Sequence, residues 1–221
     1  MVTLPMFDGL LPDDVKTAWG DPREDAPIAL PAEEALIERA VEKRKREFRK
    51  ARACARSLLH EFGVREFPLL SGPQREPLWP EGLIGSVTHT DGLCAVAVAS
   101  RRLYAGIGID VEPAEPLSER IANRVCSAEE LAIARAQNEL DALTLARVLF
   151  SAKEAFYKAQ FCVTQKFLGF SDVAVELGGN GVFFVRVVAD VAELANTQFV
   201  GRWASRGGFV LTSSWLGQKL G

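Results

Sequence analysis

Hydrophobic positions in the first third of the chain recur with a helical period. Between residues 32 and 62, apolar side chains return every three or four positions. Pro31 suits the first turn of a helix, and Gly63 follows the last apolar position. We therefore predict one helix over 32–62. Residues 1–30 are rich in Pro, Asp and Gly and have no clear period, which predicts an irregular leader with one short helix at most.

The next segment changes to the pattern of short strands. Small and apolar residues over 84–88, 93–100 and 105–111 predict three strands, and the four residues 101–104 predict a hairpin between the second and the third. Before them, the density of proline and glycine over 68–85 predicts a structured loop.

The second half again places helices before strands. Helices are predicted over 127–137 and 141–160, and Ser127 and Glu130 have the spacing of a capping box. Strands are predicted over 173–177, 182–188, 199–204 and 209–215, with a hairpin turn at 178–181. This order indicates an α+β fold with a structural duplication that no sequence repeat supports. Prolines at 113 and 116 place the boundary between two lobes, 1–112 and 113–221.

Composition limits the class of protein. Of the 221 residues, 48% are hydrophobic and 25% are charged, which are globular proportions, and the net charge of −3 argues against a bulk nucleic-acid binder. Residues 39–56 hold nine Lys or Arg against two Glu, a net charge of +7, so the rest of the chain carries −10. The four scattered cysteines indicate buried thiols. With no signal-like N-terminus and no long apolar stretch, we expect a soluble cytoplasmic protein.

One polar segment ends a predicted strand. Asp110 and Glu112 are two residues apart, so their carboxylates share one face of the strand. Two close carboxylates repel each other unless a cation or a proton lies between them, and hard oxygen ligands suit Mg²⁺. The alternative is a solvated strand end before Pro113.

Two further segments could bind an anion or move a proton. Glu154 and Lys158 lie one turn apart on a predicted helix whose flanking aromatic residues indicate burial, although a surface ion pair is the alternative. His89 follows a short strand and precedes Gly92, a loop position suited to contact with an anion. A hydrogen-bonded structural histidine is the alternative there, and His60 is interpreted as structural or solvated.

In this order the three segments resemble the 4′-phosphopantetheinyl transferases of the surfactin/enterobactin-synthetase type. The Gly-Ile-Asp-x-Glu sequence at 108–112 and the Phe-Ser-x-Lys-Glu-Ala-x-x-Lys sequence at 150–158 match the two motifs of that family, with 44 residues between Asp110 and Glu154. The basic helix, the Pro-x-Trp-Pro loop at 77–80, the Thr-His pair at 88–89 and residues 168–170 are also similar. The resemblance covers about 35–215.

The resemblance implies an activity and a fold. Such an enzyme transfers the phosphopantetheine arm of coenzyme A to a serine of an apo acyl, aryl or peptidyl carrier protein and releases adenosine 3′,5′-bisphosphate. It would serve polyketide, nonribosomal-peptide, siderophore or fatty-acid synthases. The implied fold has two similar α+β lobes related by a pseudo-twofold axis, with the active site in the cleft between them. The protein is expected to be a monomer without a nucleic-acid or membrane partner.

The resemblance also assigns roles to residues. Glu154 would be the general base, directly or through water, and Lys158 would contact phosphate and assist departure of the leaving group. The implied ligands of Mg²⁺ are Asp110, Glu112 and Glu154. The implied contacts to coenzyme A are Arg44, Arg52, Thr88, His89 and Lys158. Many relatives carry a lysine where this chain has Gln74, and Arg75 is the candidate to replace it.

Two other functions fit parts of the pattern. A metal-dependent phosphodiester hydrolase or nuclease also uses acidic triads with a lysine, but its catalytic lysine usually follows a carboxylate by two residues, and here Pro113 and Ala114 follow Glu112. A non-catalytic partner of a biosynthetic assembly would bind coenzyme A without any need for Mg²⁺.

Overall fold

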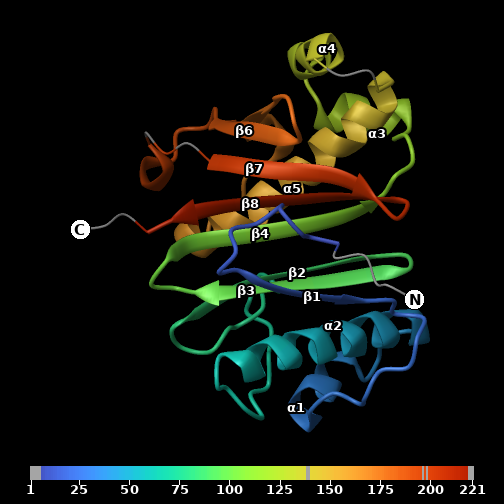
Figure 1. Ribbon diagram of the computed structural model, residues 1–221, viewed down its shortest axis with the longest axis vertical. Coiled ribbons are helices and arrows are strands. Elements are labelled where there is room, and N and C mark those ends of the chain that lie inside the picture. The colour runs from blue at the N-terminus through green and yellow to red at the C-terminus, as the bar shows by residue number, and fades with distance from the viewer. Residues whose placement is uncertain (1–5, 138–139, 196, 198, 219–221) are drawn as a thin grey trace.

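The computed structural model describes residues 6–137, 140–195, 197 and 199–218, which form two antiparallel sheets with helices packed against them (Figure 1). The smaller sheet has the order β1-β3-β2 and the larger one the order β4-β8-β7-β6-β5. This mixture confirms the predicted α+β class. Within the described ranges, no helix combines the length and the apolar character needed to cross a membrane.

The smaller sheet is packed against a long helix. Its strands are β1 (Lys16–Gly20), β2 (Leu83–Thr90) and β3 (Leu93–Ser100), and the helix is α2 (Glu42–Glu61). Alternate residues of β3, among them Val96 and Val98, face the apolar side of α2. Strand β1 lies in the segment that the sequence predicts as an irregular leader. That prediction is wrong for 16–20, because these residues complete the free edge of β3.

The predicted single helix over 32–62 is interrupted before Glu42. A short helix α1 (Pro31–Glu34) and a 3₁₀ turn η1 (Ala35–Ile37) precede α2, and Val41 before α2 is extended. The reason is packing: the segment before α2 turns back so that Ala29 and Ile37 bury against Phe48 of α2. A continuous helix would leave these apolar side chains without that contact.

The larger sheet carries the second long helix. Its strands are β4 (Tyr104–Pro113), β5 (Val173–Leu177), β6 (Val182–Val187), β7 (Phe199–Arg206) and β8 (Phe209–Gly217). Helix α5 (Ala142–Thr164) packs on this sheet, and two shorter helices, α3 (Glu119–Val125) and α4 (Ala128–Gln137), precede it. Two 3₁₀ turns, η2 (Phe170–Asp172) and η3 (Ala192–Leu194), complete the elements. The four predicted strands of this half are confirmed, whereas α3 is not predicted.

The predicted hairpin between 93–100 and 105–111 is wrong. Strand β3 pairs with β1 on one edge and β2 on the other, so it has no edge left for β4. Strand β4 pairs instead with β8, about a hundred residues further along the chain. Sheet membership therefore changes between β3 and β4, one strand before the predicted lobe boundary at 112/113. The two lobes, as folding units, stay a prediction.

Strands β2 and β4 lie side by side at a seam between the sheets. Side-chain hydroxyls bridge it: Ser86 Oγ accepts a hydrogen bond from Ile109 N–H (3.0 Å), and Thr88 Oγ1 accepts one from Val111 N–H (3.2 Å). These two bonds replace the backbone ladder that would otherwise join neighbouring strands. The seam holds the end of β2, with Thr88 and His89, beside the end of β4, with Asp110.

Glycine lets α5 lie directly on β4. A Cβ atom at Gly108 would be 1.9 Å from the carbonyl oxygen of Ala155, and one at Gly106 would be 2.2 Å from that of Ala159. Any larger residue would push the helix away from the strand. This close approach places the 154–158 turn of α5 over Asp110.

Candidate active site

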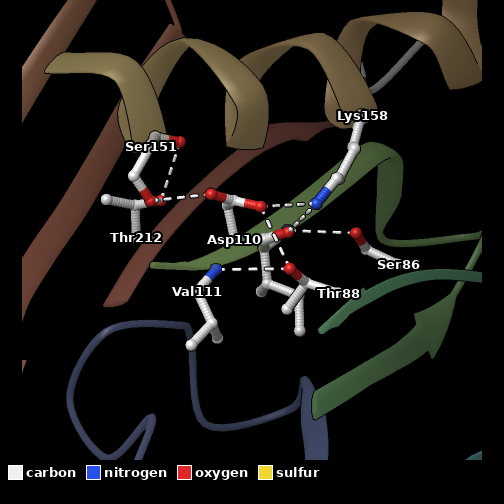
Figure 2. A network of polar contacts seen from close by, with 8 residues as sticks. Ser86, Thr88, Asp110, Val111, Ser151, Lys158 and Thr212 are labelled. Atoms are coloured by element: carbon white, nitrogen blue, oxygen red, sulfur yellow. Dashed lines mark hydrogen bonds and ion pairs between the residues drawn. The ribbon is translucent and has the colours of Figure 1, made fainter. Parts of the chain in front are cut away.

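Asp110 is the centre of a buried polar network at the seam (Figure 2). Its Oδ1 accepts hydrogen bonds from Lys158 Nζ (2.7 Å) and Thr88 Oγ1 (3.0 Å), and its Oδ2 accepts one from Ser151 Oγ (2.9 Å). Lys158 Nζ also donates to the carbonyl oxygen of Ile109 (3.0 Å). The sequence predicts Asp110 and Lys158 as parts of one site, and the structure brings them into direct contact.

Two hydroxyl residues of this network are missed by sequence reasoning. Ser151 Oγ lies 2.8 Å from Thr212 Oγ1, and Thr212 Oγ1 is 2.9 Å from the carbonyl oxygen of Ser151. Thr212 stands opposite Asp110 in the register of β4 and β8. Ser151 lies inside the second motif, and the Thr-Ser-Ser run at 212–214, unusual in a buried strand, is the signal that could have identified Thr212.

Glu112 is held away from the Asp110 network by an arginine. Its Oε2 is 2.6 Å from a terminal nitrogen of Arg147 on α5, and Arg147 Nε donates to the carbonyl oxygen of Glu115 (3.0 Å). Burial and then the charge of Asp110 raise the pKa of Glu112 to about 7, although Arg147 opposes the rise. Arg147 is a second site residue that the sequence does not single out.

Glu154 lies close enough to Asp110 and Lys158 for their charges to affect its carboxyl. Burial and the charge of Asp110 raise the pKa of its carboxyl, while Lys158 lowers it. Within the described part of the chain, this carboxylate forms no hydrogen bond or ion pair. A raised pKa and an unengaged carboxylate are properties suited to a proton acceptor.

A cavity of about 550 Å³ opens beside Glu154 and Lys158. It lies between α5 on one side and the loop 74–83 with β2 on the other. Arg75 and Trp79 line the loop side, and Tyr157 lines the helix side. The cavity therefore separates elements that pack on different sheets, as the resemblance implies for the active site.

The three predicted metal ligands share a neighbourhood but are not gathered into a ligand set. Among the described residues, no group of three or more His, Cys, Asp or Glu is arranged to hold a metal ion. Asp110 already accepts bonds from three side chains, and Glu112 is paired with Arg147. The donor chemistry nevertheless fits a hard divalent cation, because Asp110 raises the pKa of both Glu112 and Glu154 and a cation would relieve that repulsion.

Arg44 and His89 meet at the surface near the ends of α2 and β2. A terminal nitrogen of Arg44 contacts His89 Nε2, and Glu47 on α2 lies within 3.1 Å of His89 Nε2 and 3.5 Å of Arg44. Burial, followed by the charge of Arg44, lowers the pKa of His89. The sequence predicts the first two as contacts to coenzyme A but does not predict Glu47.

Arg52 and Thr88 are placed differently from the other predicted contacts. Arg52 is buried, with its guanidinium 4.1 Å from the Phe48 ring centroid and its Nε 3.7 Å from Glu33. Burial lowers the pKa of Arg52 to about 10. Thr88 is also buried, and its hydroxyl donates a hydrogen bond to Asp110 and accepts one from the Val111 N–H. A phosphate role for these two residues stays a prediction.

Lys153, the first lysine of the second motif, points away from this network. Its Nζ donates to Glu130 (2.9 Å) and to the carbonyl oxygens of Val125 (2.9 Å) and Phe170 (3.0 Å). Glu130 in turn accepts from Ser127 N–H (2.8 Å), and its own N–H donates to Ser127 Oγ (3.1 Å). These two bonds confirm the predicted capping box at the start of α4.

Comparisons with known proteins match most of the chain. The family model of the 4′-phosphopantetheinyl transferase N-terminal domain matches residues 32–99, and that of the 4′-phosphopantetheinyl transferase superfamily matches 106–212. The chain is 36% identical over 220 residues to the 4′-phosphopantetheinyl transferase Npt of Nocardia iowensis, covering 94% of this chain and 98% of that protein. It is 38% identical to PptT of Mycobacterium tuberculosis, covering 83% and 84%.

A third relative carries a more specific name. The chain is 33% identical over 173 residues to enterobactin synthase component D of Salmonella typhi, covering 77% of this chain and 71% of that protein. Two family models that together span most of the sequence, and relatives above 30% identity over nearly full length, leave one conclusion. The chain is an enzyme of the 4′-phosphopantetheinyl transferase superfamily.

Proposed function

We propose that this enzyme transfers the 4′-phosphopantetheine arm of coenzyme A to a serine hydroxyl of an apo carrier protein, with Mg²⁺, and releases adenosine 3′,5′-bisphosphate. The observation that carries the proposal is the junction of Asp110, Glu154 and Lys158 beside a cavity of about 550 Å³. That junction supplies an anchored cation for phosphate and a carboxylate able to accept a proton.

Glu154 is the proposed general base. Its raised pKa makes it a better proton acceptor than an ordinary carboxylate, and its position on the cavity wall lets a serine hydroxyl approach it directly or through water. Lys158 is fixed by Asp110 and the Ile109 carbonyl, with its ammonium on the same wall. A phosphate of the substrate can therefore meet a cation whose position is set in advance.

Asp110, Glu112 and Glu154 are the residues that would hold Mg²⁺. When bound, the metal neutralises negative charge on the pyrophosphate of coenzyme A. This chain's own residues must then rearrange their pairing, since Asp110 and Glu112 now receive their positive charge from Lys158 and Arg147. Arg147 would then have donors for phosphate oxygens, and so would Lys158, which would keep its bond to the Ile109 carbonyl.

The remaining contacts to coenzyme A are proposed for basic groups on the cavity wall and on the surface near the ends of α2 and β2. Arg75 lines the cavity with Glu154 and Lys158, and Arg44 and His89 lie together at the surface. Thr88 and Arg52 support this region from buried positions. Arginine suits phosphate because its planar fork donates parallel hydrogen bonds.

The carrier is proposed to be an acyl, aryl or peptidyl carrier protein. The name of the enterobactin synthase relative associates that protein with a siderophore, and polyketide, nonribosomal-peptide and fatty-acid carriers are equally compatible with the site. We further propose that the enzyme is a cytoplasmic monomer that needs no nucleic acid or membrane.

Incubation with coenzyme A, Mg²⁺ and several apo carrier proteins tests the proposal. We expect a mass increase of one phosphopantetheine on the carrier serine, and its loss in Glu154→Gln. Glu61→Gln, an exposed residue at the end of α2, is the matched control and should transfer normally. If none of the carrier proteins gains the phosphopantetheine mass, the proposal is refuted. Release of nucleotides from DNA would favour a hydrolase, and binding of coenzyme A insensitive to Mg²⁺ would favour a non-catalytic partner.

A further inference from the structure

A carboxylate lies behind the two basic groups at the surface. Glu47 Oε2 is 3.1 Å from His89 Nε2 and 3.5 Å from a terminal nitrogen of Arg44. The side chain of Glu47 is only 12% exposed, whereas those of Arg44 and His89 are 49% and 39% exposed. A ligand arriving from solvent therefore meets Arg44 and His89 first, with the carboxylate beneath them.

The carboxylate of Glu47 offsets the repulsion between the two basic groups. Arg44 and His89 are in direct contact, so a protonated His89 would repel the arginine. Arg44 lowers the pKa of His89, and Glu47 raises it; Lys158 of α5 lowers it and Asp110 of β4 raises it more weakly. Glu47 is thus the acidic group that raises the pKa of His89 most, and its carboxylate lies close to both partners.

Neighbouring acidic groups do not serve the pair in this way. Asp91 lies 3.5 Å from Lys43, and both side chains are exposed. The exposed Glu42 lies 3.2 Å from the half-buried Lys45, with the same i,i+3 spacing on α2. Such pairs contribute a few tenths of a kcal/mol to helix stability. Glu47 differs because it is mostly buried and joins two elements, α2 and β2.

The chemistry of the substrate indicates what the pair would bind. Under the function proposed above, the pyrophosphate of coenzyme A belongs beside Lys158 and the carboxylates of β4 and α5. The resemblance to the transferase family implies that Arg44 lies on the side of the monoester on the ribose 3′ oxygen and that His89 contacts a phosphate of coenzyme A; the contacts of Glu47 are what this structure adds. A phosphate monoester is a dianion near neutral pH, and it suits a guanidinium with an adjacent imidazole.

We propose that Glu47 is a positioning residue that holds Arg44 and His89 together as a receptor for this 3′-phosphate, and so sets the preference for coenzyme A over dephospho-coenzyme A. The inference rests on the proposed function, because it takes coenzyme A as the substrate. Glu47 touches no substrate atom. It fixes the two donors before the phosphate arrives, so less conformational freedom is lost on binding.

Calorimetric titration of the full chain with coenzyme A and with dephospho-coenzyme A tests the inference. In Glu47→Gln we expect Kd for coenzyme A to rise about tenfold, as when an outer partner of a ligating side chain is removed. Kd for dephospho-coenzyme A should change less than about twofold, since it lacks the phosphate that the pair receives. Glu47→Asp keeps the charge and should recover part of the selectivity. Glu42→Gln removes the same charge from the same helix and should bind both ligands like the wild type.

Transfer assays separate this inference from the proposed function. At saturating coenzyme A, Glu47→Gln should keep the wild-type kcat and show only a raised KM. The inference is overturned if Glu47→Gln weakens both ligands equally, if it leaves both unchanged, or if the wild type does not distinguish them. Should Glu47→Gln fail to fold, a Glu47→Asp protein with unchanged selectivity overturns it too. Wild-type protein that prefers coenzyme A but transfers nothing would refute the proposed function and leave this inference standing.

Discussion

Replacement of Lys153 by methionine provides the sharpest test of how the second motif is built. The side chain is 2% exposed, and its three donors are all used, on Glu130 and on two backbone carbonyls. Lys153→Met keeps an unbranched side chain one atom shorter but leaves the Glu130 carboxylate buried without its counter-ion. Removal of one partner of a buried ion pair costs about 3–5 kcal/mol.

That cost is large compared with the stability of a typical domain, about 5–15 kcal/mol. With an unfolding entropy of about 2.1 cal/mol/K per residue, the 221 residues correspond to about 0.46 kcal/mol/K. A loss of about 4 kcal/mol therefore lowers Tm by about 9 °C. Thermal unfolding followed by circular dichroism measures the shift directly.

Two further proteins make the result specific. Lys166→Met breaks an exposed ion pair with Glu193, in which the two side chains are 52% and 41% exposed, and should cost less than about 1 kcal/mol. The double variant Glu130→Gln, Lys153→Met removes the stranded charge but keeps an acceptor for the backbone, so it should melt above the single variant. A Tm for Lys153→Met within about 2 °C of the wild type would refute the reasoning, as would a double variant that melts no higher.

Three other predictions follow from the structure. Lys158→Met should lower transfer about a hundredfold or more, measured by carrier mass at a temperature where thermal unfolding shows the variant to be folded, because it also leaves the buried Asp110 without its counter-ion. Normal transfer would exclude a phosphate role. Gly108→Val should lower the free energy of unfolding by about 3 kcal/mol or more, because the valine side chain would meet the backbone of α5. Gly179→Ala, where the new side chain meets open space, should lower it by less than about 1 kcal/mol. Equal losses would contradict the close packing of α5 on β4. A hydrogen bond from Arg49 lowers the pKa of Glu34 below the ordinary glutamate pKa of about 4.3. The ionised carboxylate therefore stabilises the folded state above about pH 4.3, and this stabilisation is lost as the pH falls through the lowered pKa. Denaturation of Glu34→Gln and wild type at pH 7 and pH 3 should show a difference of at most about 1 kcal/mol at pH 7 that becomes smaller at pH 3, and a difference that does not shrink in acid would contradict this assignment.

Local patterns predicted the elements well, because each depends on its own residues. The helix over 141–160, the strands of the second half and the capping box of Ser127 and Glu130 all follow from periodicity or a four-residue motif. The partner of β4 did not follow, since the choice between β3 and β8 depends on which strand edge is free. The missed strand β1 has the same cause: its five residues are ordered by pairing with β3.

The candidate site divides in the same way. Spacing alone paired Asp110 with Glu112 and Glu154 with Lys158, each on one face of one element, and the resemblance to the transferase family joined the two pairs into one site. The sequence does not indicate Glu47 and Thr212 as site residues, because their roles depend on contacts with other elements packed against their own. Arg52 shows the converse: the sequence pattern of a basic helix does not reveal that the segment before α2 folds back and buries that arginine.

The hydroxyl seam between β2 and β4 has a consequence for solubility and for substrate access. Each sheet turns one of its two edge strands inward at this seam, where Ser86 and Thr88 use N–H groups of β4 that could otherwise pair with another chain. Parting the sheets would expose both edges and remove the Thr88 hydroxyl from Asp110. Substrates should therefore enter along the ends of the two strands while the seam stays closed.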